Sequence, residues 1–220
     1  MAILLRRDGR SGPGATTPRR RVRIVSLVEI NPRGETMIRS GDRLENPVTG
    51  EVLVFNRTSQ ETDGESVLVE TIVRQDGFVA AAHVHPFQTE RFEVFEGALG
   101  LRVGEKELIA RAGDVAVVAP GTPHRFWNAG NGEARFLCEI APALKFESLI
   151  ETMFTLAAEG KTNGKGLPNP LRLAVIAKAH FDTVRLPFPP AWLQRAALAV
   201  GAPIGRLLRY PPAVTAAPAH

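Results

Sequence analysis

The feature that most constrains the fold is a series of short strand-like runs between residues 37 and 140. Each run is five to eight residues long, and turn signals rich in Gly, Pro, Asn or Asp separate one run from the next. The runs cover residues 37–41, 51–58, 66–73, 78–85, 90–97, 99–104, 106–110, 114–119, 124–128 and 134–140. Many short strands at such spacing are typical of an antiparallel sandwich or barrel. We therefore expect a mainly β domain over residues 36–142.

The spacing of apolar residues changes from a strand-like to a helical pattern after Pro142. Residues 144–160 space their apolar side chains at three and four positions, as an amphipathic helix does, and end at Gly160. Two more helices are expected over 171–184 and 190–210, the last broken or kinked at Gly201–Pro203. The helical extension, residues 143–212, is too apolar to stand free, so we expect it to pack on the β domain or on a partner. Residues 213–220 read as a tail.

The basic character of the chain belongs to its first residues. Residues 1–23 hold seven arginines and one acidic residue, so this segment carries a net charge of +6. The whole chain has a net charge of +4, and the other 197 residues therefore carry −2. Arginines in a Gly/Pro/Ser/Thr context without interleaved aromatic residues are typical of a partly disordered arm, here residues 1–35. This composition does not favour nucleic-acid binding.

The remaining sequence features bear on compartment and assembly. The single cysteine, Cys138, excludes an internal disulfide and a cysteine-based zinc cluster. No secretory signal is expected, and Arg195, Pro203 and Arg206 interrupt the longest apolar stretch, so no transmembrane segment is expected either. We expect a cytoplasmic protein and a homodimer formed through the apolar stripe that begins at Trp192. Arginines beside the stripe leave contact with a membrane surface as an alternative.

Two of the five histidines lie one residue apart in a strand-like run. Side chains alternate faces along a strand, so His83 and His85 point the same way, about 6.6 Å apart along the chain. A hairpin-like return brings Glu90 beside them, and His124 follows the Pro/Gly turn of a second segment. Histidine and carboxylate ligands suit Fe, Mn, Ni, Zn or Cu. Without the second segment, the histidine pair is more simply explained as surface decoration or core packing.

Two motifs in these segments resemble the paired signatures of the cupin superfamily. The fixed positions of the first motif are Gly77, His83, His85, Glu90 and Gly97, and those of the second are Gly113, Gly121, His124 and Asn128. One position departs, because Ala119 stands where the family has a proline. The resemblance implies an antiparallel jelly-roll (cupin) barrel. It also implies one divalent transition metal ion, Fe, Mn, Ni, Cu or Zn, bound by His83, His85, Glu90 and His124.

The resemblance also sets the functional hypotheses. The ligand set is most similar to small quercetin-dioxygenase-type cupins, so we expect a metal-dependent dioxygenase-like oxidoreductase that acts on a small enol or phenolic molecule. Glu90 is the candidate catalytic base, and Phe87, Phe92 and Phe126 are candidate pocket residues, with plain core packing as their alternative. A non-catalytic barrel that binds a small ligand, as a sensor or store, is a second hypothesis. A sugar isomerase or epimerase is a third and weaker one.

Overall fold

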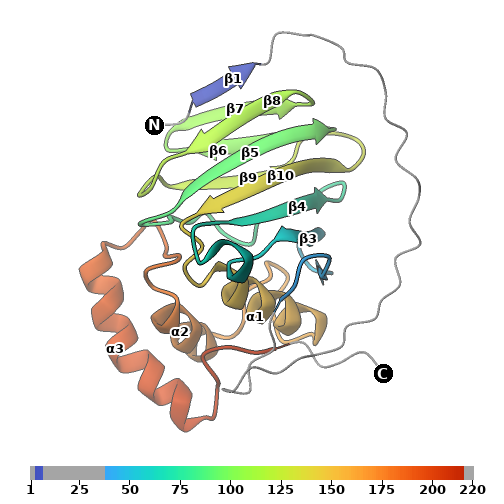
Figure 1. Cartoon of the computed structure of the whole chain (residues 1–220). Helices are drawn as coiled ribbons and strands as arrows, with labels where there is room; N and C mark the ends of the chain where they lie inside the picture. The colour runs from blue at the N-terminus through green and yellow to red at the C-terminus, as the bar shows by residue number, and fades with distance from the viewer. Residues whose placement is uncertain (1–2, 7–37, 216–220) are drawn as a thin grey trace.

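The computed structural model describes residues 3–6 and 38–215, and it is mainly β with antiparallel sheets and three α-helices (Figure 1). Most of the expected basic arm and residues 216–220 lie outside the described residues. The strands are β1 (Ile3–Arg6), β2 (Arg43–Asn46), β3 (Glu51–Arg57), β4 (Val67–Val73), β5 (Thr89–Glu96), β6 (Ala98–Val103), β7 (Lys106–Arg111), β8 (Asp114–Val118), β9 (His124–Asn128) and β10 (Ala134–Ala141). The helices are α1 (Phe146–Ala158), α2 (Pro170–Ala179) and α3 (Ala191–Leu207), and η1 (Gln60–Thr62) is a short 3-10 helix.

The strands form two antiparallel sheets. The larger sheet has the order β1-β8-β5-β10-β4-β3-β2, and the smaller has the order β7-β6-β9. The mainly β, antiparallel architecture expected from the sequence is confirmed. Two edge strands were not predicted, β1 and β2, and the first expected run, residues 37–41, instead contains a turn at Ser40 and Gly41.

Alternation of buried and partly exposed residues explains the central strands. In β4 and β10 every second residue is buried, which is the pattern of a strand with one face against a core. Cys138 lies on the buried face of β10 with Phe136 and Ile140, as its position in the sequence predicted. Burial raises the pKa of the Cys138 thiol well above its ordinary value, so the thiol behaves as a small core residue.

Three phenylalanines join the two sheets. Phe92 of β5 and Phe136 of β10 belong to the larger sheet, and Phe126 of β9 belongs to the smaller. Their ring centroids lie 5.6–6.3 Å apart in tilted or edge-to-face arrangements. Aromatic pairs at these separations add stabilisation beyond the area that they bury.

The run at residues 78–85 does not form the regular strand that the sequence predicted. It pairs with β9 at two isolated bridges, Phe78 with Trp127 and His83 with His124. The two bridges are five residues apart in this segment but only three residues apart in β9. A continuous ladder needs equal numbers of residues on both strands, so the two extra residues force the segment out of register.

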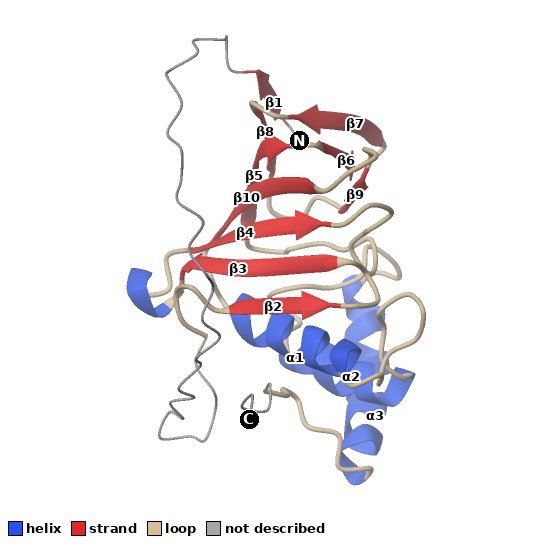
Figure 2. Cartoon of the chain, turned by 90° about the vertical axis from the view of Figure 1, so that its right-hand side faces the viewer, coloured by secondary structure: helices blue, strands red, loops and turns tan. Residues whose placement is uncertain are grey.

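The helices gather beside the β2 side of the larger sheet (Figure 2). Helix α1 contacts β2 and adds Phe146 and Phe154 to the core of the β domain, while α3 packs on α2. The expected break at Gly201–Pro203 is not present, because α3 continues through Pro203. A proline removes one backbone donor, and the remaining hydrogen bonds of the helix carry it past that point. Helix α2 ends at Ala179, five residues earlier than expected.

The close contact of α3 with α2 depends on Gly205. A Cβ atom at this position would lie 2.5 Å from the carbonyl oxygen of Leu171 and 2.6 Å from Cγ2 of Val175. Glycine therefore permits a backbone approach that a larger residue prevents. None of the described helices is long and apolar enough to cross a membrane.

We predict that Leu101→Ala lowers the free energy of unfolding by about 2–5 kcal/mol, because Leu101 is fully buried between the sheets and its truncation leaves a cavity. Ile109→Ala on the neighbouring strand β7 is the control, since Ile109 is 50% exposed. The free energy of unfolding of Ile109→Ala should fall by less than about 1 kcal/mol. Urea denaturation of both variants checks the difference, and equal losses would contradict this assignment of the core.

Candidate metal centre

Three histidines and one glutamate form a buried cluster. The cluster consists of His83, His85, Glu90 and His124, and one ligand atom from each residue lies within 4.8 Å of the others. His85, Glu90 and His124 are between 2% and 6% exposed. Such a set of donors is able to hold a metal ion.

Backbone pairing brings these residues together. The amide of His83 donates to the carbonyl of His124 and the reverse, both at 2.9 Å. The amide of Gly121 donates to the carbonyl of His85 at 2.8 Å, and this bond holds the Pro/Gly turn before β9 against the His85 segment. Gly121 has a φ of +76°, which favours glycine at this turn. Glu90 enters from β5, where it pairs with Ile140 of β10 on one side and Val118 of β8 on the other.

Each imidazole has its Nδ1 atom against an acceptor. The Nδ1 atoms of His83 and His124 lie 2.9 Å from the carbonyl oxygens of Ala81 and Thr122. A carbonyl oxygen only accepts, so these Nδ1 atoms carry the hydrogen. In the neutral form of either ring, Nε2 is then the atom that carries the free lone pair.

His85 is held in the same tautomer by two acceptors. Its Nδ1 atom lies 2.6 Å from the carbonyl oxygen of Thr183 and 2.8 Å from Oε1 of Gln88. The amide of Gln88 is oriented by its nitrogen, which donates to the carbonyls of Pro142 and Ala143. Thr183 follows α2, so a residue of the helical extension fixes a ring in the β domain. Such outer contacts orient metal ligands and raise their basicity.

The Nε2 lone pairs converge on the carboxylate of Glu90. Nε2 of His85 lies 3.5 Å from Oε1, and Nε2 of His124 lies 2.5 Å from Oε2. These two closest atoms, Nε2 of His124 and Oε2 of Glu90, are buried and have no hydrogen-bond partner among the described residues. Two acceptors at this separation repel each other unless a proton or a metal cation lies between them.

The electrostatics of the cluster favour a cation. Burial acts to raise the pKa of Glu90, but the neighbouring His85, His124 and His83 outweigh it and lower the pKa to about 2. Burial lowers the pKa of His83 to about 3, with help from the like charges of His124 and His85. Near neutral pH the carboxylate is therefore ionised and His83 is neutral, which are the forms that coordinate metals.

His124 responds in the opposite direction. Burial acts to lower its pKa, but the contact with Glu90 is stronger and raises the pKa above its ordinary value. A proton shared with Glu90 thus competes with a metal ion for this pair. The residues fit a divalent ion, because four donors are present and three of them, His83, His85 and Glu90, line a cavity.

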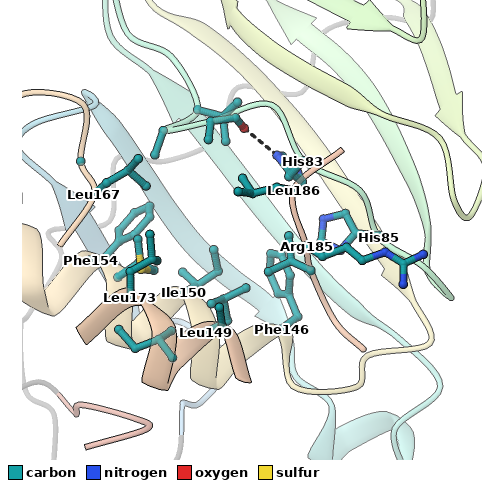
Figure 3. Close-up of a pocket in the computed structure, with 18 of the residues that line it drawn as sticks. His83, His85, Phe146, Leu149, Ile150, Phe154, Leu167, Leu173, Arg185 and Leu186 are labelled. Atoms are coloured by element: carbon teal, nitrogen blue, oxygen red, sulfur yellow. Dashed lines mark hydrogen bonds between the residues drawn. The ribbon is translucent and has the colours of Figure 1, made fainter. Parts of the chain in front are cut away.

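The cavity has a volume of about 500 Å³, within the range of small-molecule sites. Its wall includes His83, His85 and Glu90 at one end, and strands and helices contribute the rest (Figure 3). Apolar side chains predominate, among them Leu149, Ile150, Phe154, Leu167 and Leu173 from the helical extension. Phe92 and Phe126, which the sequence singled out for the pocket, line this cavity. Phe87 is 59% exposed and is not among the residues that line it.

Glu51 is an acidic residue of the cavity wall that was not expected from the sequence. It is 6% exposed and lines the cavity from β3. Burial raises its pKa to about 7, against the opposing effect of its hydrogen bond with Thr49. The signal was available, because Glu51 shares strand parity with the apolar residues Leu53 and Phe55. Thr183, which holds His85, and Arg185, which lines the cavity, had no such signal, since their positions depend on how the helical extension folds back.

Comparison with known proteins identifies the β domain. A family model described as a cupin domain matches residues 63–139. No curated protein matches the chain significantly. Similar solved structures include a predicted oxalate decarboxylase from Thermotoga maritima, with 20% identity, 49% of this chain and 99% of that chain covered, and a TM-score of 0.42.

Two further solved structures are similar over comparable lengths. An uncharacterised conserved protein with a double-stranded β-helix domain from Klebsiella pneumoniae has 26% identity, covers 50% of this chain and 92% of that chain, and has a TM-score of 0.40. A sugar phosphate isomerase of the cupin superfamily from Silicibacter pomeroyi has 22% identity and a TM-score of 0.42, and the match covers 48% of this chain and 73% of that chain. The match to the family model spans all four residues of the cluster and supports the resemblance of this domain to the cupin superfamily.

Proposed function

We propose that the chain is a metal-binding cupin in which His83, His85, Glu90 and His124 hold one divalent transition metal ion. The observation that carries this proposal is the buried cluster of three imidazoles and one carboxylate, whose ligand atoms all lie within 4.8 Å of one another. The metal is Fe, Mn, Ni, Cu or Zn, since the ligand set suits all of these. We also propose that the two sheets form the jelly-roll barrel that the resemblance implies.

We further propose that the protein is a dioxygenase-like oxidoreductase that acts on a small enol or phenolic substrate. When bound, a redox-active metal ion supplies Lewis acidity and one-electron chemistry. Glu90 is the group that would accept the substrate proton, since it is the one carboxylate of the cluster and it lines the cavity. Phe92 and Phe126 exclude water from that end of the cavity and give an aromatic or enol substrate an apolar wall.

A non-catalytic role in ligand binding is the second candidate. The observation that favours it is the scarcity of titratable groups in the cavity wall, where Glu51 is the one carboxylate besides Glu90 among the described lining residues. The same apolar wall offers the hydroxyl groups of a sugar few partners. We therefore do not carry the isomerase hypothesis forward.

The expected homodimer stays a prediction. Helix α3 exposes several apolar side chains that such an interface would bury, among them Trp192, Val200 and Leu207, which are 66–83% exposed. A patch of this kind is typical of an interaction surface.

We predict that the purified protein binds one metal ion per chain and that Glu90→Gln weakens binding. The loss should exceed the roughly 10–100-fold that removal of an outer-shell partner costs, because Glu90 is a proposed ligand. Glu93→Gln is the matched control, since Glu93 lies on the same strand but its side chain is paired with Arg91. Elemental analysis measures the metal content of the two variants, and chelator competition measures their metal affinity. Equal affinities of the two variants would rule out Glu90 as a ligand.

Metal affinity should rise with pH. The raised pKa of His124 means that this ring keeps its proton to a higher pH than an ordinary histidine does, and the metal ion must displace that proton. His83 does not compete there, because its pKa is lowered to about 3. The dissociation constant should therefore fall as the pH rises through the ordinary titration range of histidine, by up to about tenfold per pH unit. Chelator competition across this range is the measurement, and a flat profile would contradict the shared proton.

If the protein is a dioxygenase, the iron-loaded form should consume oxygen in the presence of a flavonol or an enediol. Per bound ion, Glu90→Gln should lower this rate by about 10²–10⁴-fold, the usual contribution of a general base. An oxygen electrode, with metal content determined on the same samples, separates loss of base from loss of metal. Binding of such molecules without oxygen uptake by any loaded form would favour the non-catalytic role.

A further inference from the structure

The cavity has a second polar site on the β2–β3 hairpin. Asn46 and Glu51 are directly opposite each other in the pairing of these strands, and both line the cavity. They are 2% and 6% exposed. Buried polar groups in an apolar wall are costly unless they find partners, so a pair of them is a feature to be explained.

The hydrogen bonds of this pair leave one atom of each side chain free. Oδ1 of Asn46 accepts from the amides of Val48 and Thr49, at 3.1 and 3.2 Å. Oε2 of Glu51 accepts from the hydroxyl of Thr49 at 2.7 Å. Within residues 3–6 and 38–215, Nδ2 of Asn46 and Oε1 of Glu51 make no hydrogen bond. One donor and one carboxyl oxygen are therefore available to a ligand.

Space is left beside this pair by Gly166, which also lines the cavity. Gly166 has a φ of +76°, and a Cβ atom there would lie 2.9 Å from Cγ2 of Thr49 and 3.9 Å from Nδ2 of Asn46. A larger residue would crowd the hairpin at the point where the free amide nitrogen lies. The site is thus open as well as polar.

The strand register puts this pair far from the metal centre. Glu90 pairs with Ile140, and Ile140 pairs with Val67, at one end of β10 and β4. Glu51 pairs with Val73, and Val73 pairs with Ala134, at the other end of the same two strands. Six residues separate the two levels, which is roughly 20 Å of strand. The cavity is therefore elongated, with a polar site toward each end.

The wall between the two sites is apolar. From the sheet it includes Leu53, Val69 and Phe136, and from the helices it includes residues of α1, α2 and α3. Arg185 is the one cationic side chain among the described residues that line the cavity, and it lies next to Leu186, outside the hairpin. The Asn46–Glu51 site therefore offers no positive charge to an anionic group.

We propose that the cavity binds an elongated, largely apolar molecule that carries an oxygen ligand at one end, for the metal centre, and a hydroxyl group at the other, for Asn46 and Glu51. A hydroxyl both accepts, from Nδ2 of Asn46, and donates, to Oε1 of Glu51. Burial raises the pKa of Glu51 to about 7, so its carboxyl group is partly neutral and tolerates an uncharged partner. The metal end of this inference rests on the proposed function, and the hydroxyl end does not.

Three twelve-carbon probes test the inference on the wild-type protein loaded with zinc. These are 12-hydroxydodecanoate, dodecanoate and dodecanedioate, and calorimetry measures their dissociation constants. The hydroxy acid should bind about tenfold more tightly than dodecanoate, since it adds two hydrogen bonds in a buried site. Dodecanedioate should bind most weakly, because its second carboxylate would meet Glu51 without a cation. Equal binding of the three probes, or no binding, overturns the inference.

Two variants locate the effect. Glu51→Met keeps the size of the side chain and should abolish the preference for the hydroxy acid while dodecanoate still binds. Leu173→Trp should fill the apolar body of the cavity and weaken all three probes. A preference that survives in Glu51→Met would overturn the hydroxyl site.

Metal content, determined on every sample, separates the two proposals. If the wild type holds no zinc, the proposed function fails, and the preference for the hydroxy acid over dodecanoate in metal-free protein still decides the hydroxyl site. If zinc is bound and the preference is missing, only the further inference fails.

Discussion

The fixed orientation of three imidazole rings is the constraint on which the account depends. Each ring places Nδ1 against a carbonyl or amide oxygen, so Nε2 is the ring atom left for the cluster, and Nε2 of both His85 and His124 lies against Glu90. These outer contacts come from backbone positions two residues before His83 and His124, and from Thr183 after α2. The fold therefore sets the tautomers before any ion arrives, which is the preorganisation that a metal site needs.

This arrangement connects the helical extension to the candidate metal centre. The carbonyl of Thr183 holds His85, and the backbones of Val84 and Arg185 exchange hydrogen bonds at 2.9 and 3.0 Å. The same extension supplies the wall of the cavity that faces the sheet (Figure 3). The extension thus contributes both to the geometry of the histidine cluster and to the shape of the pocket, and the candidate metal centre and the apolar cavity adjoin each other.

Much of this could be predicted from the sequence, because local patterns determine it. Alternation within β4, β5 and β10, together with the turn residues between strands, predicted the antiparallel sheets. The spacing of His83, His85 and Glu90, with His124 in a second segment, predicted the cluster. The irregular path of residues 78–85 could not be predicted, since it results from a two-residue mismatch with β9. The Glu51 site and the Thr183 contact also depend on tertiary packing rather than on local pattern.

X-ray absorption spectroscopy of the zinc-loaded protein tests the central claim most directly. The account predicts imidazole scattering from three histidines, with nitrogen at about 2.0–2.1 Å and carboxylate oxygen at about 2.0–2.2 Å. The outer-shell pattern of the imidazole rings should correspond to coordination through Nε2, because Nδ1 of every ring is already bonded to an acceptor. A first shell with fewer than two imidazoles, or one of oxygen alone, would contradict it.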